Sequence, residues 1–97
     1  MLPVVYLPPT ERHFRKLKDK RLKDKFRQAI SHIREDPRIG QAKSGDLRGL
    51  YGLEVYHNKT NYDLAYRLAL LDDGQIVVVV MAGTRETFYK QLKRYLE

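Results

Sequence analysis

Apolar and polar residues alternate along residues 62–70, and this two-residue period is typical of a strand with one buried face. The stretch from 75 to 81 is instead almost entirely apolar and mostly β-branched, which favours a central strand covered on both faces. Asp72-Asp73-Gly74 supplies turn residues between the two. The same reasoning predicts two shorter strands, at residues 2–7 and 50–56.

A three- to five-residue spacing of apolar side chains indicates helices in the N-terminal third of the chain. The spacing extends from Phe14 to Ile33 and predicts a helical hairpin, or one bent helix, with a joint near residues 18–20. Its second part, about residues 20–35, has the cleaner period. After Gly83 we expect a last amphipathic helix, apolar on one face and rich in lysine and arginine around the rest.

Proline, glycine and polar residues set the expected boundaries of these elements. Pro8-Pro9 closes the first strand and Thr10 suits the N-cap of the first helix. Asp36-Pro37 ends the second helix. Residues 38–48 contain two glycines and predict one long polar loop, and residues 57–61 predict a polar turn.

The predicted element order is β-α-α-β-β-β-α, which indicates an α+β domain. We expect a small antiparallel sheet with an N-terminal helical hairpin and a C-terminal helix, all packed on one side. A chain of 97 residues has the size of one domain, and no shift in composition divides it. Residues 1–97 are therefore expected to form a single unit.

The amino-acid composition limits the expected cellular compartment and binding partners. Nineteen lysines and arginines against 12 aspartates and glutamates give a net charge of +7, which favours polyanionic partners or an acidic protein. No apolar run approaches the roughly 20 residues of a membrane span, and the N-terminus does not resemble a signal peptide. We therefore expect a cytoplasmic protein that does not bind membranes. The chain has no cysteine and its three histidines are scattered, so neither a metal nor another cofactor is expected.

Three motifs in the second half carry a family resemblance. Leu47-Arg48-Gly49 follows a proline and a loop and precedes a strand. The segment NYDLAYRL has an aromatic residue, then polar and apolar residues, then a tyrosine. The chain ends on an apolar strand, Gly83-Thr84-Arg85, Tyr89 and a basic helix. In this order and spacing, over nearly its whole length, the sequence resembles the RelE/ParE toxin family of bacterial and archaeal toxin–antitoxin systems, and most closely the RelE-like mRNA interferases.

The resemblance implies a toxin that binds the ribosomal A site, cuts mRNA there without a metal, and is neutralised by a cognate antitoxin protein. A ParE-type toxin would instead inhibit DNA gyrase without cutting RNA, and a third alternative is a non-catalytic domain that binds RNA or an antitoxin. The family pattern is matched at Arg48, Arg85 and Tyr89. It is not matched at Gly52 and Glu54, where the best-known member has lysines, nor at Asp63, where it has an arginine.

Two neighbouring strands are expected to carry the acid–base chemistry. If Tyr56 pairs with Asp63 across the polar turn, Glu54 lies on the same face as Asp63 and Arg67 and diagonal to both. A nearby carboxylate raises the pKa of a glutamate and a nearby arginine lowers it. Such a setting suits Glu54 as the general base that takes the proton of the 2′-hydroxyl.

Arg85 would hold the non-bridging phosphate oxygens with its planar guanidinium fork. Tyr89 would protonate the leaving oxygen or stack on a base. The expected catalytic residues are therefore Arg85, Tyr89, Glu54, Arg67 and Asp63.

Each of these residues also has a purely structural interpretation. Glu54 and Arg67 would form only a cross-strand ion pair. Tyr89 would be a partly buried residue on the rim of the last helix, and Arg85 would brace the strand-to-helix corner. His57 offers an acid or base with an ordinary pKa near 6.5, or is a solvated turn histidine.

The remaining basic residues predict RNA contacts. Nine lysines and arginines lie between Arg12 and Arg27 against two aspartates. This run suits a salt-dependent grip on ribosomal RNA phosphates, or else the solvated face of amphipathic helices. The expected RNA-binding set joins this run to loop and turn residues near the site: Lys16, Lys23, Lys43, Arg48, His57 and Lys59.

Overall fold

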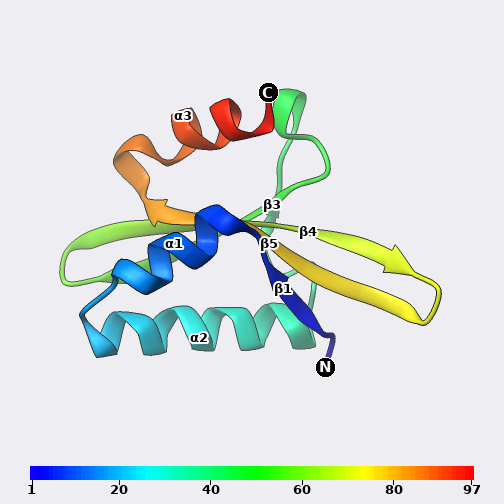
Figure 1. Cartoon of the computed structure of the whole chain (residues 1–97), viewed down its shortest axis with the longest axis horizontal. Coiled ribbons are helices and arrows are strands. Elements are labelled where there is room, and N and C mark those ends of the chain that lie inside the picture. The colour runs from blue at the N-terminus through cyan, green and yellow to red at the C-terminus, as the bar shows by residue number, and fades with distance from the viewer.

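The computed structural model describes all of residues 1–97, as three α-helices and a five-stranded sheet (Figure 1). In chain order the elements are β1 (Val4–Tyr6), α1 (Pro8–Lys16), α2 (Lys20–Glu35), β2 (Gln41–Ala42), a 3-10 turn (Gly45–Leu47), β3 (Tyr51–His57), β4 (Thr60–Leu71), β5 (Gly74–Thr84) and α3 (Arg85–Leu96). The predicted α+β order is confirmed. The structure adds β2 and the 3-10 turn inside the segment predicted to be a loop.

The sheet has the strand order β1-β5-β4-β3-β2. Strands β2 to β5 pair antiparallel as expected, but β1 lies parallel to β5. The prediction of an antiparallel sheet is therefore wrong at this edge. A parallel pair needs a long crossover, and here most of the chain separates the two strands, so local turn signals do not reveal the pairing.

Helices cover both faces of the sheet, and the prediction that all of them pack on one side is wrong (Figure 1). Phe26 and Ile33 of α2 pack on the face that carries Val77 and Val79. Phe88 and Leu92 of α3 pack on the opposite face, which carries Val78 and Val80. The reason is that β5 is apolar on both sides, as its sequence predicts, and each side needs cover.

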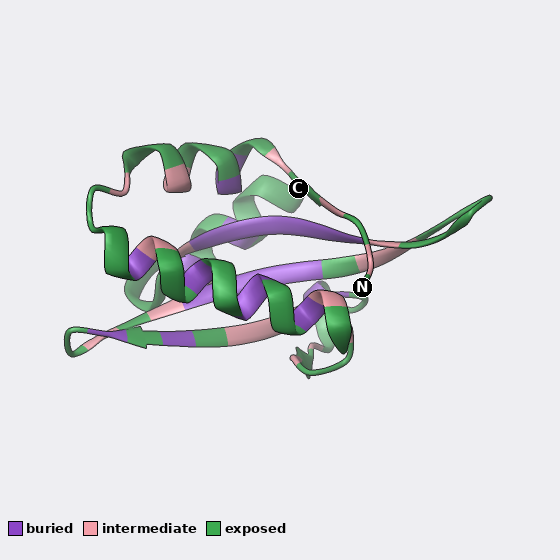
Figure 2. Cartoon of the chain, turned by 90° about the horizontal axis from the view of Figure 1, so that it is seen from below, coloured by how far each residue is buried: buried purple, intermediate pink, exposed green.

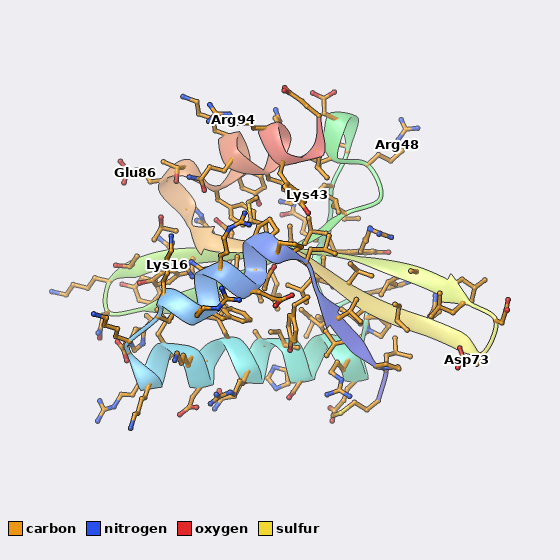
Figure 3. All side chains as sticks on the ribbon, viewed as in Figure 1. Lys16, Lys43, Arg48, Asp73, Glu86 and Arg94 are labelled. Carbon is orange, nitrogen blue, oxygen red and sulfur yellow. The ribbon has the colours of Figure 1, made fainter.

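The β4–β5 hairpin extends beyond the helices and carries Asp73 near its tip (Figure 3). Figure 2 shows the same hairpin as mostly exposed, in contrast to the buried middle of the two strands. The turn at Asp72-Asp73 with Gly74 at a φ of 129° confirms the predicted turn chemistry. None of the helices is both long and apolar enough to cross a membrane.

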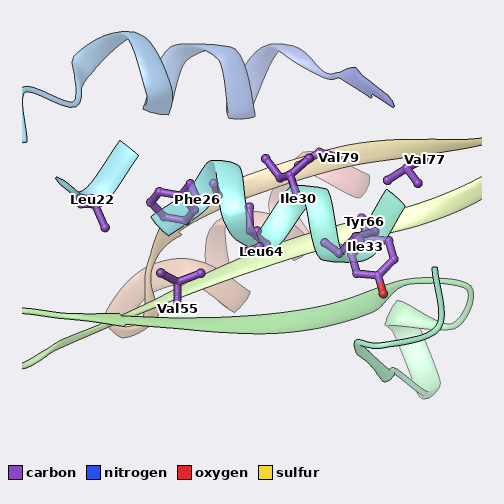
Figure 4. Packing of buried hydrophobic residues seen from close by; sticks show 11 residues of the cluster. Leu22, Phe26, Ile30, Ile33, Val55, Leu64, Tyr66, Val77 and Val79 are labelled. Atoms are coloured by element: carbon purple, nitrogen blue, oxygen red, sulfur yellow. The ribbon is translucent and has the colours of Figure 1, made fainter. Parts of the chain in front are cut away.

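The larger core lies between α2 and the sheet. Leu22, Phe26, Ile30 and Ile33 recur on one face of α2 and pack on the sheet, in part against the fully buried Tyr66 (Figure 4). The helix has the predicted bounds. Its N-cap is Asp19, whose carboxylate accepts the backbone N–H groups of Arg21 and Leu22 at 2.9 and 3.3 Å.

Helix α1 begins before the predicted boundary. Pro8 and Pro9 occupy its first helical positions, where a missing N–H leaves nothing unpaired, and the N-cap is Leu7. Thr10 is therefore not the N-cap that the sequence predicts. It is buried, and its hydroxyl donates to the Val79 carbonyl at 3.1 Å, which fixes α1 to β5.

The pairing of β3 with β4 differs from the predicted register by two residues. Tyr56 lies opposite Asn61 rather than Asp63, and only Asn58 and Lys59 form the turn. Both turn residues have positive φ, 48° and 63°, as a two-residue hairpin turn requires. A shift of two residues preserves which side chains share a face but changes which ones are neighbours.

Candidate functional site

A cluster of one arginine and two carboxylates lies where β5 ends and α3 begins. The Nε and Nη2 atoms of Arg85 each lie 3.3 Å from an oxygen of Asp63, and Nη2 also lies 2.5 Å from Glu54 Oε1. The strand pairing explains this contact, because Glu54 is directly opposite Asp63, and Asp63 is opposite Gly83. Both carboxylates therefore stand beside the strand end from which Arg85 begins the helix.

The two carboxylates that contact Arg85 differ in their exposure to solvent. The side chain of Asp63 is only 3% exposed, whereas that of Glu54 is 70% exposed and that of Arg85 is 41% exposed. A buried carboxylate requires a charged or hydrogen-bonding partner, and Arg85 is that partner for Asp63. The hydrogen bond with Asp63, and then the contact with Glu54, hold the pKa of Arg85 above its ordinary value. Asp63 thus orients the guanidinium from the buried side, while Glu54 contacts it from the exposed side.

Arg67 does not belong to this cluster. The predicted register placed it diagonal to Glu54, but it lies four residues beyond Asp63 on β4 and pairs with Val78. Glu54 forms its ion pair with Arg85 instead. The expectation that Arg67 tunes Glu54 is therefore wrong, and so is the alternative of a Glu54–Arg67 cross-strand pair.

Lys43 and Tyr89 cover β3 beside the cluster. The Lys43 Nζ lies 5.0 Å from the centroid of the Tyr89 ring, within the range of a cation–π contact. A Cβ added at Gly52 would lie 2.6 Å from Lys43 Cε and 3.4 Å from the Tyr89 hydroxyl oxygen. The Lys43 side chain therefore fills the space directly over Gly52.

These side chains line one surface pocket. Its walls include an ammonium group, a phenol and the two carboxylates, and its residues come mainly from β2, β3, β4 and α3: Gln41, Lys43, Gly52, Glu54, Asp63 and Tyr89. Of the five predicted catalytic residues, the structure brings four together: Glu54, Asp63 and Tyr89 line the pocket, and Arg85 is paired with Asp63. Lys43, predicted to bind RNA, lines the same pocket. The structure contains no group of three or more His, Asp or Glu side chains arranged to hold a metal ion.

The loop that carries Lys43 is anchored by Tyr66, a residue that the sequence indicates only as part of an alternating strand. The Tyr66 hydroxyl donates to the Pro37 carbonyl at 2.9 Å and accepts the Gly40 N–H at 2.9 Å. Burial raises the pKa of Tyr66. Gly40 has no room for a side chain, since a Cβ would lie 2.7 Å from the Tyr66 hydroxyl and 2.9 Å from the Gly52 carbonyl. This anchor positions the start of β2 and hence Lys43.

The predicted RNA-binding residues lie on several different surfaces. Lys43 and Arg48 line a neighbouring pocket and extend the site. Lys59 is exposed in the β3–β4 turn, and Lys16 ends α1. Lys23 lines a groove between α1 and α2.

His57 has a structural role in place of the predicted solvated turn position. It ends β3, is 7% exposed, and its Nε2 lies 2.9 Å from Asp19 Oδ2 at the start of α2. Because side chains alternate along β3, His57 faces α2, on the opposite side of the sheet from Glu54. Both the solvated interpretation and a role for His57 as acid, base or RNA ligand at this pocket are therefore wrong. The alternation was visible in the sequence, but the position of the turn was not.

The chain is similar in sequence and fold to known toxins. A family model described as a ParE-like toxin of type II bacterial toxin–antitoxin systems matches residues 4–93. No curated protein sequence matches the chain at a significant level.

Among solved structures, the fold is similar to that of a double mutant of the Escherichia coli toxin RelE in the free state, with a TM-score of 0.70, 20% identity and 96% of each chain covered. A YoeB/ParE toxin from Agrobacterium tumefaciens gives a TM-score of 0.68 at 16% identity, over 87% of this chain and 99% of that one. The toxin–antitoxin complex RelBE2 of Mycobacterium tuberculosis gives 0.63 at 24% identity, over 87% and 98%. With the family model matching most of its length, the chain belongs to the ParE-like toxins of type II bacterial toxin–antitoxin systems.

Proposed function

We propose that this toxin is a metal-independent, ribosome-dependent mRNA endonuclease that inhibits translation in the cytoplasm. The observation that carries the proposal is the grouping of Lys43, Glu54 and Tyr89 around one pocket, with Arg85 paired to Glu54 at its wall. Attack of a 2′-hydroxyl on its neighbouring phosphate needs a base, positive charge near the phosphorane, and an acid for the leaving 5′-oxygen. The pocket offers a side chain for each of these needs.

Glu54 is the proposed base because it is the exposed carboxylate of the cluster. An incoming phosphate competes with Glu54 for the guanidinium, since Glu54 is 70% exposed and Asp63 is buried. Binding of RNA would then release Glu54 beside the 2′-hydroxyl and leave Arg85 oriented by Asp63. In this scheme Asp63 is a positioning residue that acts through Arg85, and the product is a 2′,3′-cyclic phosphate or 3′-phosphate end.

Lys43 compensates for the missing lysine side chain at Gly52. The absence of a side chain at Gly52 leaves the space that Lys43 enters from the neighbouring loop. A cation therefore lies over β3 although the strand itself supplies none. Together with Arg85 it would stabilise the charge that develops on the phosphate oxygens. Tyr89, next to Lys43, would protonate the leaving group or stack on a base.

We also propose an antitoxin partner with an acidic, partly apolar segment. The groove between α1 and α2 has apolar walls, including Tyr6, Phe14 and Phe26, and a rim of three cations, Arg15, Lys23 and Arg27. A RelE toxin has been solved with a peptide of its antitoxin RelB, and it shares the fold of this chain at a TM-score of 0.67 and 20% identity. Co-expression with the neighbouring small reading frame should rescue growth and yield a co-purified complex. Failure of both would contradict this part of the proposal.

Inhibition of DNA gyrase is the second candidate, and one observation favours it. The two cations of the site, Lys43 and Arg85, are balanced by the two carboxylates, Glu54 and Asp63, so the pocket is not strongly positive. A site of that kind suits a protein surface better than an RNA phosphate. A non-catalytic RNA-binding or antitoxin-binding domain is consistent with the same balance.

One induction experiment separates these functions. The toxin is expressed in bacteria, mRNA 5′ ends are mapped, and the DNA damage response is followed in the same cultures. Cuts confined to translated regions support the endonuclease. Intact mRNA with trapped DNA breaks and an SOS response would replace it by the gyrase inhibitor, and normal growth would leave only a binding domain.

A further inference from the structure

A second cavity, of about 520 Å³, lies between α1 and α3 and shares no lining residue with the pocket at Glu54 and Tyr89. Its floor includes Met81 and Ala82 of β5. Polar side chains from the two helices form the rest of the lining: Arg12, His13, Lys16, Gln91, Arg94 and Tyr95. The geometry points to a binding site for RNA backbone phosphate in this cavity, separate from the site of cleavage. The inference extends the proposed function, on which it rests only for the choice of RNA as the ligand.

The charges around the cavity have one sign. Arg12 and Lys16 lie one helical turn apart on α1, and Arg94 lies on α3 (Figure 3 labels Lys16 and Arg94). No aspartate or glutamate lines the cavity, and none of the three cations takes part in an ion pair. Arg85, in contrast, is paired with two carboxylates. Three unpaired cations around one cavity repel one another, and an anion that enters it relieves the repulsion.

His13, which lines the cavity with the three cations, has no hydrogen-bond partner at Nε2. This nitrogen atom is buried. Burial, and then the charge of Lys16, lower the pKa of His13, so its ring is neutral in the free protein at pH 7. A phosphate in the cavity would favour the protonated ring. The pKa of His13 should therefore rise when an anion binds in the cavity.

The other lining groups favour RNA over an acidic peptide. Two of the three cations are arginines, whose planar forks match phosphate and carboxylate oxygens alike, so the preference for RNA comes from the neighbouring Tyr95. Tyr95 is 40% exposed at the edge of the cavity, where its ring is available to stack on an unpaired base. Gln91 adds a side chain that both donates and accepts hydrogen bonds.

The test uses the full chain and a single-stranded hexanucleotide with 2′-O-methyl groups, which cannot be cut by attack of a 2′-hydroxyl. Affinity is measured by fluorescence anisotropy at several salt concentrations. Arg12→Gln and Arg94→Gln each remove one cation of the cavity. Their controls are Lys90→Gln and Lys93→Gln on α3, which each remove one exposed cation that does not line the cavity.

We expect each cavity variant to weaken binding about fivefold and to lower the salt slope by about 0.7, the value for one phosphate contact on a single strand. The controls should change affinity less than twofold. Equal losses in all four variants would overturn the inference, because they would indicate diffuse charge attraction. An oligoglutamate of matched charge that binds the cavity as tightly as the RNA would also overturn it, in favour of an acidic protein partner.

A second readout follows the His13 ring by NMR in the wild-type protein. The charged groups that line the cavity with His13 are Arg12 and Lys16 from α1 and Arg94 from α3. From α2, the uncharged ring of Phe26 packs against the His13 ring, with centroids 5.7 Å apart. RNA should raise the pKa of His13, whereas an unchanged His13 titration would overturn the inference. Binding of the methylated RNA without any mRNA cuts in cells would refute the proposed endonuclease and leave this site standing.

Discussion

The carboxylate of Asp63 is almost completely buried and holds Arg85 through two contacts of 3.3 Å, so the residue expected to bind phosphate is already oriented by the protein. Glu54 reaches the same guanidinium from the exposed side. In the proposed mechanism the cluster has two states, one with Glu54 on Arg85 and one with a phosphate in its place. Because Asp63 is buried and Glu54 is exposed, substitutions of Arg85 and of Glu54 should affect stability differently.

Arg85→Ala should reduce mRNA cleavage by about 10²- to 10³-fold, the usual scale for one preorganised electrostatic donor. It should also lower the free energy of unfolding by about 1–3 kcal/mol, because Asp63 is left buried without its partner. Arg85→Lys should restore most of the stability and only part of the activity, since it keeps the charge but loses the fork. Single-turnover cleavage in a purified translation system and urea denaturation measure the two effects. Wild-type cleavage by the Arg85→Ala protein would leave Arg85 as a structural brace.

Glu54→Gln should slow cleavage by about 10²- to 10⁴-fold, the range for loss of a general base, and should flatten the acidic limb of the pH–rate profile. Because Glu54 is exposed, the free energy of unfolding should change by less than about 1 kcal/mol. Glu86→Gln is the control, since Glu86 is an exposed glutamate in the first turn of α3. An unchanged acidic limb in the Glu54→Gln protein would assign the base elsewhere.

Lys43→Ala should reduce cleavage by about 10- to 100-fold, which corresponds to one charged hydrogen bond to the phosphate. Gly52→Ala provides an independent test of the same cation, because the new Cβ would force the flexible Lys43 side chain out of its place. Lys59→Ala, an exposed lysine in the β3–β4 turn, is the charge-matched control. If Lys43→Ala and Lys59→Ala behave alike in the cleavage assay, Lys43 contributes only to general attraction of RNA.

Tyr66→Phe should lower the free energy of unfolding by about 1–3 kcal/mol, because it removes the acceptor of the Gly40 N–H and the donor to the Pro37 carbonyl. Cleavage should fall as well, since the loop that carries Lys43 loses its anchor. Tyr51→Phe is the matched control: Tyr51 stacks on Tyr66 with ring centroids 5.3 Å apart but does not share the anchor. Equal urea midpoints for the two variants would show that the anchor contributes nothing.

The sequence pattern predicted the elements well where the signal is local. The period of α2 and the apolar run of β5 each depend on residues within one element, and the structure has both. β4 forms as a strand, but the prediction that only one of its faces is buried is wrong, because residues 63–66 are all buried between helices on the two sides of the sheet. The family motifs likewise placed Arg85 and Tyr89 at one corner. The predicted register was wrong by two residues, which does not change the face of the sheet on which a side chain lies. Glu54 and Asp63 were therefore predicted on the correct face.

What the pattern did not reveal depends on contacts between distant segments. The parallel pairing of β1 with β5 and the placement of helices on both faces require knowledge of the whole sheet. Lys43 enters the site from a loop that is held in place by Tyr66, and no local signal links the two. Arg67 was wrongly predicted to lie beside Glu54 because the turn between β3 and β4 was predicted to be longer than its two residues, Asn58 and Lys59.

The contact between Asp19 and His57 predicts how stability depends on pH. The hydrogen bond from His57, and then the N–H of Leu22 at the start of α2, hold the pKa of Asp19 below its ordinary value of 3.8. The folded protein therefore binds fewer protons at Asp19 than the unfolded chain does. The resulting stabilisation is complete above about pH 4 and is lost as the pH falls below 3.8 through the folded pKa.

Asp19→Asn should remove this part of the pH dependence, which urea denaturation at a series of pH values below about 5 measures. Asp24→Asn is the control, because Asp24 is an exposed aspartate of the same helix that pairs only with Arg27, at 3.0 Å. The control should lose stability on acidification as the wild type does, whereas the Asp19→Asn curve should be flatter. Parallel curves for the wild type and both variants would mean that the hydrogen bond between Asp19 and His57 does not stabilise the fold.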